Sequence, residues 1–294
     1  MSLCLQFLDD AQEFLTIAGE HLSQDPVQNT VVATMAQRLA AGEVGAADHW
    51  WLVVHDDGEL VGAAMRTAPF PPRPAFLLPM PEEAAELLAR TLYDREEVVL
   101  GMNGALPAVR VCAEEMARLT GGATEVVLHT RLFKIHQVVS PTPPKGRLRL
   151  AVPGDCELAM AWFAAFMADA DEQAGRTPGS SPHESPSRDG MMRRIESECL
   201  WLWVDETDHP VHLTAVNEVS YGVSRLSPVY TPSEHRGCGY ASAAVAEVSQ
   251  RILDQGVRPC LFTDQANPTS NRIYQALGYK PVTDMADLKI RHSP

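Results

Sequence analysis

The sequence predicts a mixed α/β protein folded as two domains. Segments with apolar residues at helical spacing alternate with shorter extended segments rich in Val, Leu and Trp. The chain has 294 residues, which is long for one domain and comfortable for two. Residues 141–146, Pro-Thr-Pro-Pro-Lys-Gly, read as a stiff, extended linker. We therefore expect one domain at residues 1–140 and a second at 147–294, each with helices flanking strands.

The first domain is expected to begin with two helices. Phe7, Phe14 and Leu22 recur at helical spacing within residues 5–25, and a second apolar stripe follows over 27–41. The further elements expected before the linker are a hairpin of strands at 50–55 and 60–66 turning at 56–58, an extended piece at 75–78, a helix at 82–93, a strand at 98–101, a helix at 105–120 and a long strand pair at 125–138.

The second domain shows a similar alternation. Its expected elements are a strand at 147–152, a helix capped by Asp155, a helix at 191–199, strands at 200–204, 211–216 and 224–230, a helix at 240–255, a strand at 260–263 and a short helix that ends at Gly278. Residues 175–190 are rich in Pro, Ser and Gly and have no periodicity. They fit either a tolerated surface insertion or a lid that orders over substrate, and mobility without substrate is expected.

Composition excludes several classes of function. A net charge of −14 does not attract nucleic acid. No apolar run approaches the roughly 18 residues of a membrane span, and the N-terminus lacks the basic region of a signal peptide. The six cysteines are scattered and the histidines follow no metal-ligand spacing. We expect a soluble cytoplasmic protein without a metal.

The stretch from Arg236 to Ala241, Arg-Gly-Cys-Gly-Tyr-Ala, lies where an extended segment gives way to a helix. Gly237 and Gly239 remove side chains where a ligand must approach the backbone, and the first turn of a helix offers unpaired N–H groups and a positive dipole end. This corner is suited to bind a pyrophosphate. Its spacing matches neither a nucleotide-hydrolase loop nor a dinucleotide fingerprint.

A second motif follows the next predicted strand. Asn267-Pro268 predicts a helix cap with proline in the first helical position. Asn271 and Tyr274 lie three residues apart and so share one face of that short helix. The helix therefore presents polar groups near the glycine-containing corner.

Together the two motifs resemble those of the GNAT superfamily of N-acyltransferases, over about residues 147–290. Arg236, Gly239 and Ala241 fill the acyl-coenzyme A loop Q/R-x-x-G-x-G/A, and residues 267–279 resemble the second motif. The resemblance implies a tandem arrangement of GNAT-like domains with mixed, mostly antiparallel sheets. It implies acetyl-CoA as the donor, bound by Val229, Tyr230, Thr231, Arg236, Gly237, Cys238, Gly239, Tyr240, Ala241, Ser242, Asn267, Asn271 and Tyr274.

The resemblance also implies roles for single residues. Tyr274 would be the catalytic general acid toward the departing thiolate, and backbone groups of Val229 and Thr231 would polarise the thioester carbonyl. Cys238 would be a spectator, because the family transfers the acyl group directly. No general base is assigned. The candidates Asp171, Glu172, Glu218 and Ser220 have no distinguishing context.

The first domain is expected to be a degenerate copy of the same fold. Residues 101–107, Gly-Met-Asn-Gly-Ala-Leu-Pro, stand where the loop is expected, and they lack its arginine and glycine pair. An unrelated α+β cap domain is the alternative.

The function expected is acetyl transfer to a primary amine of a small molecule or peptide in a ternary complex, by a monomer or homodimer. Two alternatives stay open: a catalytically silent acyl-CoA-binding or interaction module, and a tandem enzyme like mycothiol synthase.

Overall fold

The computed structural model describes residues 2–42, 49–67, 74–97, 99–173 and 186–291. It divides the chain into two compact units. Unit 1 comprises Met1–Leu132, Asp264–Ala266 and Val282–Pro294, and unit 2 comprises Phe133–Thr263 and Asn267–Pro281. The first boundary between the two compact units therefore lies between Leu132 and Phe133, and not at the linker 141–146. The division into copies at 1–140 and 147–294 concerns the repeated order of elements and stays a prediction. Most of residues 175–190 lies outside the described residues.

The order β-α-α-β-β-β-α-β-α-β occurs twice along the chain. The first series is β1 (Leu3–Leu8), α1 (Ala11–Gln24), α2 (Thr30–Ala40), β2 (Trp50–Asp56), β3 (Glu59–Arg66), β4 (Ala75–Leu77), α3 (Glu82–Asp94), β5 (Gly101–Ala105), α4 (Ala108–Leu119) and β6 (Ala123–Lys134). The second is β7 (Arg147–Leu150), α5 (Cys156–Gln173), α6 (Arg188–Glu196), β8 (Leu200–Val204), β9 (Pro210–Val216), β10 (Val223–Tyr230), α7 (Tyr240–Asp254), β11 (Arg258–Asp264), α8 (Pro268–Ala276) and β12 (Lys280–Arg291), with short 3-10 turns at Pro153–Asp155 and Ser233–His235.

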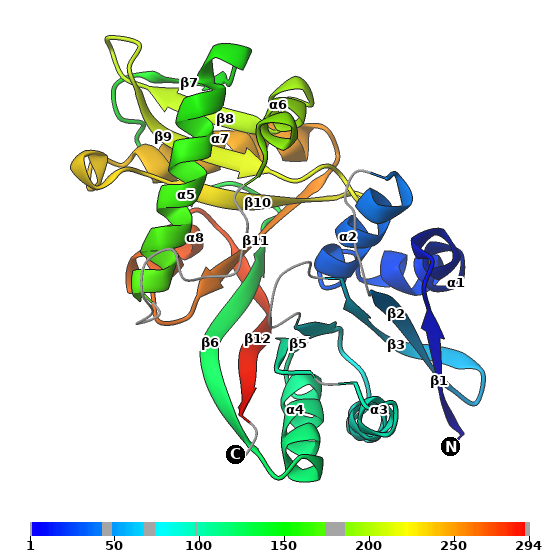
Figure 1. The fold of residues 1–294 in the computed structure, drawn as a ribbon. Helices are drawn as coiled ribbons and strands as arrows, with labels where there is room; N and C mark the ends of the chain where they lie inside the picture. The colour runs from blue at the N-terminus through cyan, green and yellow to red at the C-terminus, as the bar shows by residue number, and fades with distance from the viewer. Residues whose placement is uncertain (1, 43–48, 68–73, 98, 174–185, 292–294) are drawn as a thin grey trace. The chain divides into compact units, whose positions relative to one another are not determined.

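In unit 1 the strands follow the order β1-β2-β3-β4-β5-β12-β6 (Figure 1). The pairs β1–β2, β2–β3, β3–β4 and β5–β12 are antiparallel, and β4–β5 is parallel. The last strand of the chain thus lies inside the sheet of unit 1, where Met285 pairs with Ala105 and Lys289 with Gly101. The strand β12, from the end of the chain, therefore completes the sheet that β1 to β6 form.

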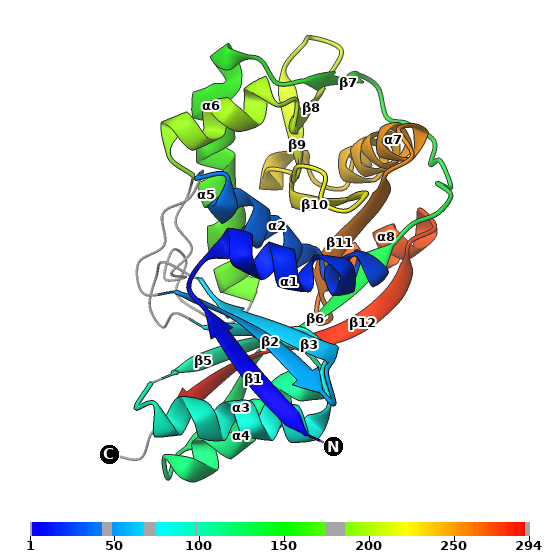
Figure 2. The ribbon, with the colours of Figure 1, turned by 90° about the vertical axis from the view of Figure 1, so that its right-hand side faces the viewer.

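Strand β2 of unit 1 is buried on both faces, which explains its unbroken apolar sequence. Trp50, Leu52 and Val54 belong to a core that includes apolar residues of α3 and α4, two helices that pack side by side (Figure 2). Trp51 points to the opposite face and stacks on Phe14 of α1, with 4.8 Å between ring centroids. Alternate side chains of one strand serve both layers.

In unit 2 the strands β7, β8, β9 and β10 form antiparallel neighbours, and β10 pairs parallel with β11. One face packs on α7 and α8, and the other face packs on α5 and α6. Residues of β8 alternate accordingly, because Trp201 and Trp203 meet the first core while Leu200 and Leu202 meet the second. Both units therefore have the predicted mixed, mostly antiparallel sheet with flanking helices.

The expectation of a helix over the whole of residues 5–25 is wrong at its start. Residues Leu3–Leu8 form β1, which pairs with β2, and burial alternates along it. The helix α1 begins only at Ala11, because the carboxylate of Asp10 accepts a hydrogen bond from the Glu13 N–H at 2.7 Å and caps it. Phe7 belongs to the strand, and its helical spacing to Phe14 is fortuitous.

Two further expectations for the first series need correction. The strand predicted at 98–101 lies later, at Gly101–Ala105, so most of the supposed degenerate loop 101–107 is the strand β5. The strand pair predicted at 125–138 is the single strand β6 in unit 1, and β12 supplies the other strand. In unit 2, Asp155 ends the 3-10 turn before α5, and its carboxylate pairs with Arg149 and accepts the Val152 N–H.

Candidate active site

The strands β10 and β11 of unit 2 separate before they end. Their paired residues run from Val223 opposite Arg258 to Leu226 opposite Leu261. Beyond this point β10 continues to Tyr230, where it still pairs with β9, and β11 continues to Asp264. The side of β10 that faces away from β9 is thereby left open at residues 227–230. Open backbone groups at a strand end are available to a ligand.

The connection from β10 to α7 contains two glycines in the left-handed conformation, Gly237 at φ +79° and Gly239 at φ +85°. A Cβ atom added at either position would meet no atom within 4 Å. The two glycines are therefore required by their backbone angles, and the space beside them is open. This refines the sequence-based argument, which gave close approach of a ligand as the reason for glycine.

Helix α7 begins without a side-chain cap, since its N-cap residue is Gly239. Among the described residues no acceptor takes the amide hydrogens of Tyr240, Ala241 or Ser242. The first turn of this helix thus presents unpaired donors and the positive end of the helix dipole. An anionic group fits this place.

Helix α8 forms another wall of the site. The side chain of Asn267 accepts the Ser270 N–H at 3.0 Å, which is the predicted N-cap. Asn271 is used within the fold: its amide nitrogen donates to the Asn267 carbonyl at 2.7 Å, and its amide oxygen accepts from the Thr263 hydroxyl at 3.2 Å. These contacts tie α8 to the end of β11.

Tyr274 of α8 is 8 % exposed and faces the same space. Its ring meets that of Tyr279 edge-on, with 5.9 Å between centroids. In the described part of the chain its hydroxyl has no hydrogen-bond partner. Burial raises the pKa of Tyr274 to about 12, so the phenol keeps its proton at neutral pH. It can donate a hydrogen bond to a group with developing negative charge.

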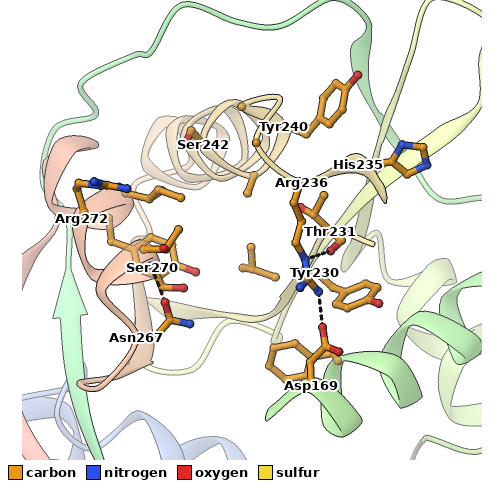
Figure 3. A pocket seen from close by; sticks show the side chains of 18 of the residues that line it. Asp169, Tyr230, Thr231, His235, Arg236, Tyr240, Ser242, Asn267, Ser270 and Arg272 are labelled. Atoms are coloured by element: carbon orange, nitrogen blue, oxygen red, sulfur yellow. Dashed lines mark hydrogen bonds and ion pairs between the residues drawn. The ribbon is translucent and has the colours of Figure 1, made fainter. Parts of the chain in front are cut away.

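These walls enclose a cavity of about 580 Å³ (Figure 3). Its charged side chains are Arg236, Arg272 and Asp169. Figure 3 shows Arg272, Asn267 and Ser270 on one side, and Arg236 with Asp169 on the other. Arg272 forms no ion pair with any described residue. The wall is therefore positive on balance although the chain carries a net charge of −14, and this local charge favours an anionic ligand.

Most of the predicted cofactor-binding residues come together at this cavity. Those that line it are Val229, Tyr230, Thr231, Arg236, Gly237, Gly239, Tyr240, Ala241, Ser242, Asn267 and Tyr274. Cys238 does not line it and is exposed to solvent, while Asn271 is held in the contacts described above. That any of these residues binds acetyl-CoA stays a prediction.

Three lining residues of α5 were not expected from the sequence: Phe166, Asp169 and Ala170. Asp169 and Ala170 follow Phe166 by three and four positions, which places all three on one helix face. This helical spacing is the sequence signal by which Asp169 could have been identified as a residue of the site. Asp171 and Glu172, which the sequence offered as candidate general bases on this helix, do not line the cavity. Asp171 is buried, and Glu172 is exposed to solvent.

A buried histidine supports the end of β10. His212 is fully buried, and its two ring nitrogens lie 2.7 Å from the Thr231 hydroxyl and 2.8 Å from the Thr214 hydroxyl. Burial lowers the pKa of His212 to about 3, so the ring is neutral. Such a weak base cannot take a proton from an amine. Its role is to hold Thr231, which lines the cavity, in one orientation.

The corresponding connection in unit 1 is different. Because β4 pairs parallel with β5 as β10 does with β11, the counterpart of the glycine-containing connection is residues 78–81, Leu-Pro-Met-Pro. It is not residues 101–107, as the sequence suggested. Pro79 and Pro81 have no N–H and the Pro81 carbonyl accepts the Ala84 N–H at 3.0 Å, so this connection with its helix start offers fewer free amide donors than the start of α7. A smaller cavity of about 390 Å³ lies beside it.

Within the described residues, every helix is too short or too polar to span a bilayer. Groups of three or more His, Cys, Asp or Glu side chains placed to hold a metal ion do not occur there.

Comparison with known proteins agrees with this architecture. Residues 207–286 match the family described as FR47-like protein. No curated protein matches the chain in sequence. The chain superimposes over 99 % of its length on 100 % of a GNAT-family acetyltransferase from Colwellia psychrerythraea, with a TM-score of 0.60 and 11 % identity. For a GCN5-related N-acetyltransferase from Sphaerobacter thermophilus the coverages are 99 % and 96 %, the TM-score 0.62 and the identity 16 %.

A third similar structure is a tandem GNAT protein from the clavulanic acid biosynthesis pathway. The superposition covers 100 % of this chain and 99 % of that protein, at a TM-score of 0.57 and 13 % identity. These similarities extend over both series of elements. The resemblance carried by the two motifs is thus confirmed, and the chain is a protein of the GNAT fold in its tandem form.

Proposed function

We propose that this protein is an acetyltransferase that uses acetyl-CoA and an amine acceptor, with a single active site in unit 2. The observation that carries the proposal is the start of α7, where three amides that no described residue accepts face a cavity with a positive wall. The same cavity adjoins the open backbone at the end of β10. The residues present fit a coenzyme A pyrophosphate and its pantetheine arm.

Acetyl-CoA would supply an activated acyl thioester at this site. The acceptor nitrogen forms a bond to the acyl carbon, the carbon–sulfur bond breaks, and the proton lost by nitrogen balances the thiolate that leaves. The backbone of residues 227–230 would align the thioester, and Tyr274 would donate a hydrogen bond at the sulfur. Thr231, held by His212, would keep the donor side of the cavity in place.

Unit 1 would not bind a second molecule of donor. Its counterpart connection has prolines in place of the glycines and fewer free amide donors at the helix start, which supports a structural role for the first series of elements. We accordingly propose that the first series is a copy of the fold without a cofactor motif.

Calorimetry with coenzyme A tests the proposal. We expect one site per chain, and two equivalent sites would contradict it. Ser242→Glu places a carboxylate in the first turn of α7 without backbone strain, so it should abolish binding, while Ser242→Gln, of the same size and neutral, should retain most of it. Thiol release from acetyl-CoA with a panel of amines then separates an enzyme from a silent binding module.

A further inference from the structure

The guanidinium of Arg236 is bound to two protein groups in the cavity. Its Nε donates to the Thr231 carbonyl at 2.9 Å, and its Nη2 forms an ion pair with the Asp169 carboxylate (Figure 3). The side chains are 49 % and 32 % exposed. Arg236 precedes the two glycines of the glycine-containing connection from β10 to α7, and Asp169 belongs to α5. The ion pair therefore joins the donor side of the cavity to the helix on its far wall.

The carboxylate of Asp169 is thus already a cation-binding group. Its position is fixed by helix α5, and Phe166 and Ala170 lie beside it on the same helix face. The ring of Tyr230 also lines this part of the cavity (Figure 3). Aromatic faces and a carboxylate are the groups that recognise organic cations in proteins. The guanidinium of Arg236 occupies the place of such a cation.

This ion pair is easily exchanged. A pair that is a third to a half exposed changes an equilibrium constant by only about one- to fivefold. Bonds from a guanidinium to phosphate oxygens are charge-assisted and bidentate, and they would add to those from the amides at the start of α7. A bound pyrophosphate therefore competes with Asp169 for Arg236. When Arg236 turns to the donor, Asp169 faces the cavity without its cation.

We propose that Asp169 is the specificity residue for the acceptor, that binding of the acyl donor frees it from Arg236, and that it then holds a second positive charge of a diamine acceptor. This inference rests on the proposed function. The charge must be a second one because a carboxylate beside an ammonium stabilises its protonated form, which has no lone pair to attack the thioester. The nitrogen that Asp169 holds is not the nitrogen that reacts.

The exchange is tested by the affinity for coenzyme A. Asp169→Asn removes the negative competitor for Arg236, so coenzyme A should bind about two- to fivefold more tightly in calorimetry. Glu172→Gln is the matched control, because it removes a carboxylate from the same helix at an exposed position away from the cavity. Equal affinities in the wild type and in Asp169→Asn would overturn the exchange.

Matched pairs of acceptors test the specificity: 1,4-diaminobutane against butylamine, and 1,6-diaminohexane against hexylamine. We expect the wild type to prefer a diamine by at least about tenfold in kcat/KM, and Asp169→Asn to lose that preference because its KM for the diamine rises toward that for the monoamine. Retention of the preference by Asp169→Asn, or its absence in both pairs with the wild type, would overturn the inference.

The two proposals fail in different ways. If the wild type does not bind coenzyme A, the proposed function fails. If it binds coenzyme A and acetylates amines but Asp169→Asn behaves as Glu172→Gln does, the function stands and the role of Asp169 is wrong. Calorimetry with 1,4-diaminobutane completes the test, because binding should be detectable only when coenzyme A is already bound.

Discussion

At the scale of single residues, Tyr274 combines burial with a hydroxyl that no described group engages. Its phenol has a pKa of about 12, whereas a thiol has an ordinary pKa of about 8.5. Full proton transfer to a thiolate is therefore uphill by roughly three to four units, and hydrogen bonding to the developing charge is the favoured contribution. The tyrosine would then act in the transition state more than in the bound state.

Tyr274→Phe should lower kcat with little change in the KM for acetyl-CoA, since in the proposed role the hydroxyl contributes only as charge develops on sulfur. We expect a loss near the lower end of the usual 10²–10⁴-fold range, about 10², because a thiolate is already a fair leaving group. Steady-state kinetics across pH measures this. Wild-type turnover in the variant would show that Tyr274 only packs in the core.

His212 predicts a pH dependence of stability. The unfolded chain protonates this histidine below its ordinary pKa of 6.5, whereas the folded chain keeps it neutral down to about pH 3. Its contribution is fully present above pH 6.5 and is lost as pH falls toward 3, by up to about 1.4 kcal/mol per pH unit. Denaturant unfolding of His212→Gln between pH 7 and 4 should show a shallower decline than the wild type. Parallel curves would refute this.

At the scale of elements, the connection from β10 to α7 depends on backbone angles that glycine adopts without cost. Gly239 is both the N-cap of α7 and left-handed at φ +85°. Any other residue there must enter the left-handed region, although the neighbouring space is open. The geometry of the amides at the start of α7 therefore depends on this residue.

Gly239→Ala should destabilise unit 2 by about 1–2 kcal/mol and weaken coenzyme A binding, because the alanine strains the turn or shifts the helix start. Gly154→Ala is the control: no atom lies within 4 Å of its added Cβ and its φ is not in the left-handed region, so it should be neutral or slightly stabilising. Thermal unfolding compares the two. Equal effects would mean that the left-handed angle carries no cost here.

At the scale of the whole molecule, the C-terminal strand β12 contributes to unit 1. Ala286, Leu288 and Ile290 are buried in the core that α3 and α4 share with β2. The antiparallel pairs between β12 and β5 join residues 180 to 188 positions apart in sequence. The N-terminal series of elements therefore has no complete core until the end of the chain is in place.

Removal of residues 282–294 should unfold or strongly destabilise unit 1, and Leu288→Ala should cost it about 2–5 kcal/mol. Lys289→Ala, an exposed neighbour on the same strand, should change little. Hydrogen exchange at β2 measures the effect on unit 1, with β8 as the reference in unit 2. Unchanged protection of β2 after the truncation would contradict the pairing.

Local patterns were enough to predict much of the site. The change from extended to helical period around Gly237 and Gly239, and the Asn267-Pro268 cap of α8, depend on neighbours within a few residues. Turn angles and helix caps are determined at that range. The first strand was missed for the complementary reason: Phe7 fits a helical spacing with Phe14, and only pairing with β2 decides that it is in a strand.

By itself the sequence determined the mixed α/β class, the tandem arrangement, the glycine-containing connection before α7 and the cap of α8 at Asn267. Only the tertiary structure decided that β12 completes unit 1, that residues 78–81 are the counterpart of that connection, and that Asp169 meets Arg236. Each of these depends on contacts between residues far apart in the chain, or on which parallel strands are neighbours. Local spacing carries no information about such partners, because many distant segments satisfy the same hydrophobic pattern.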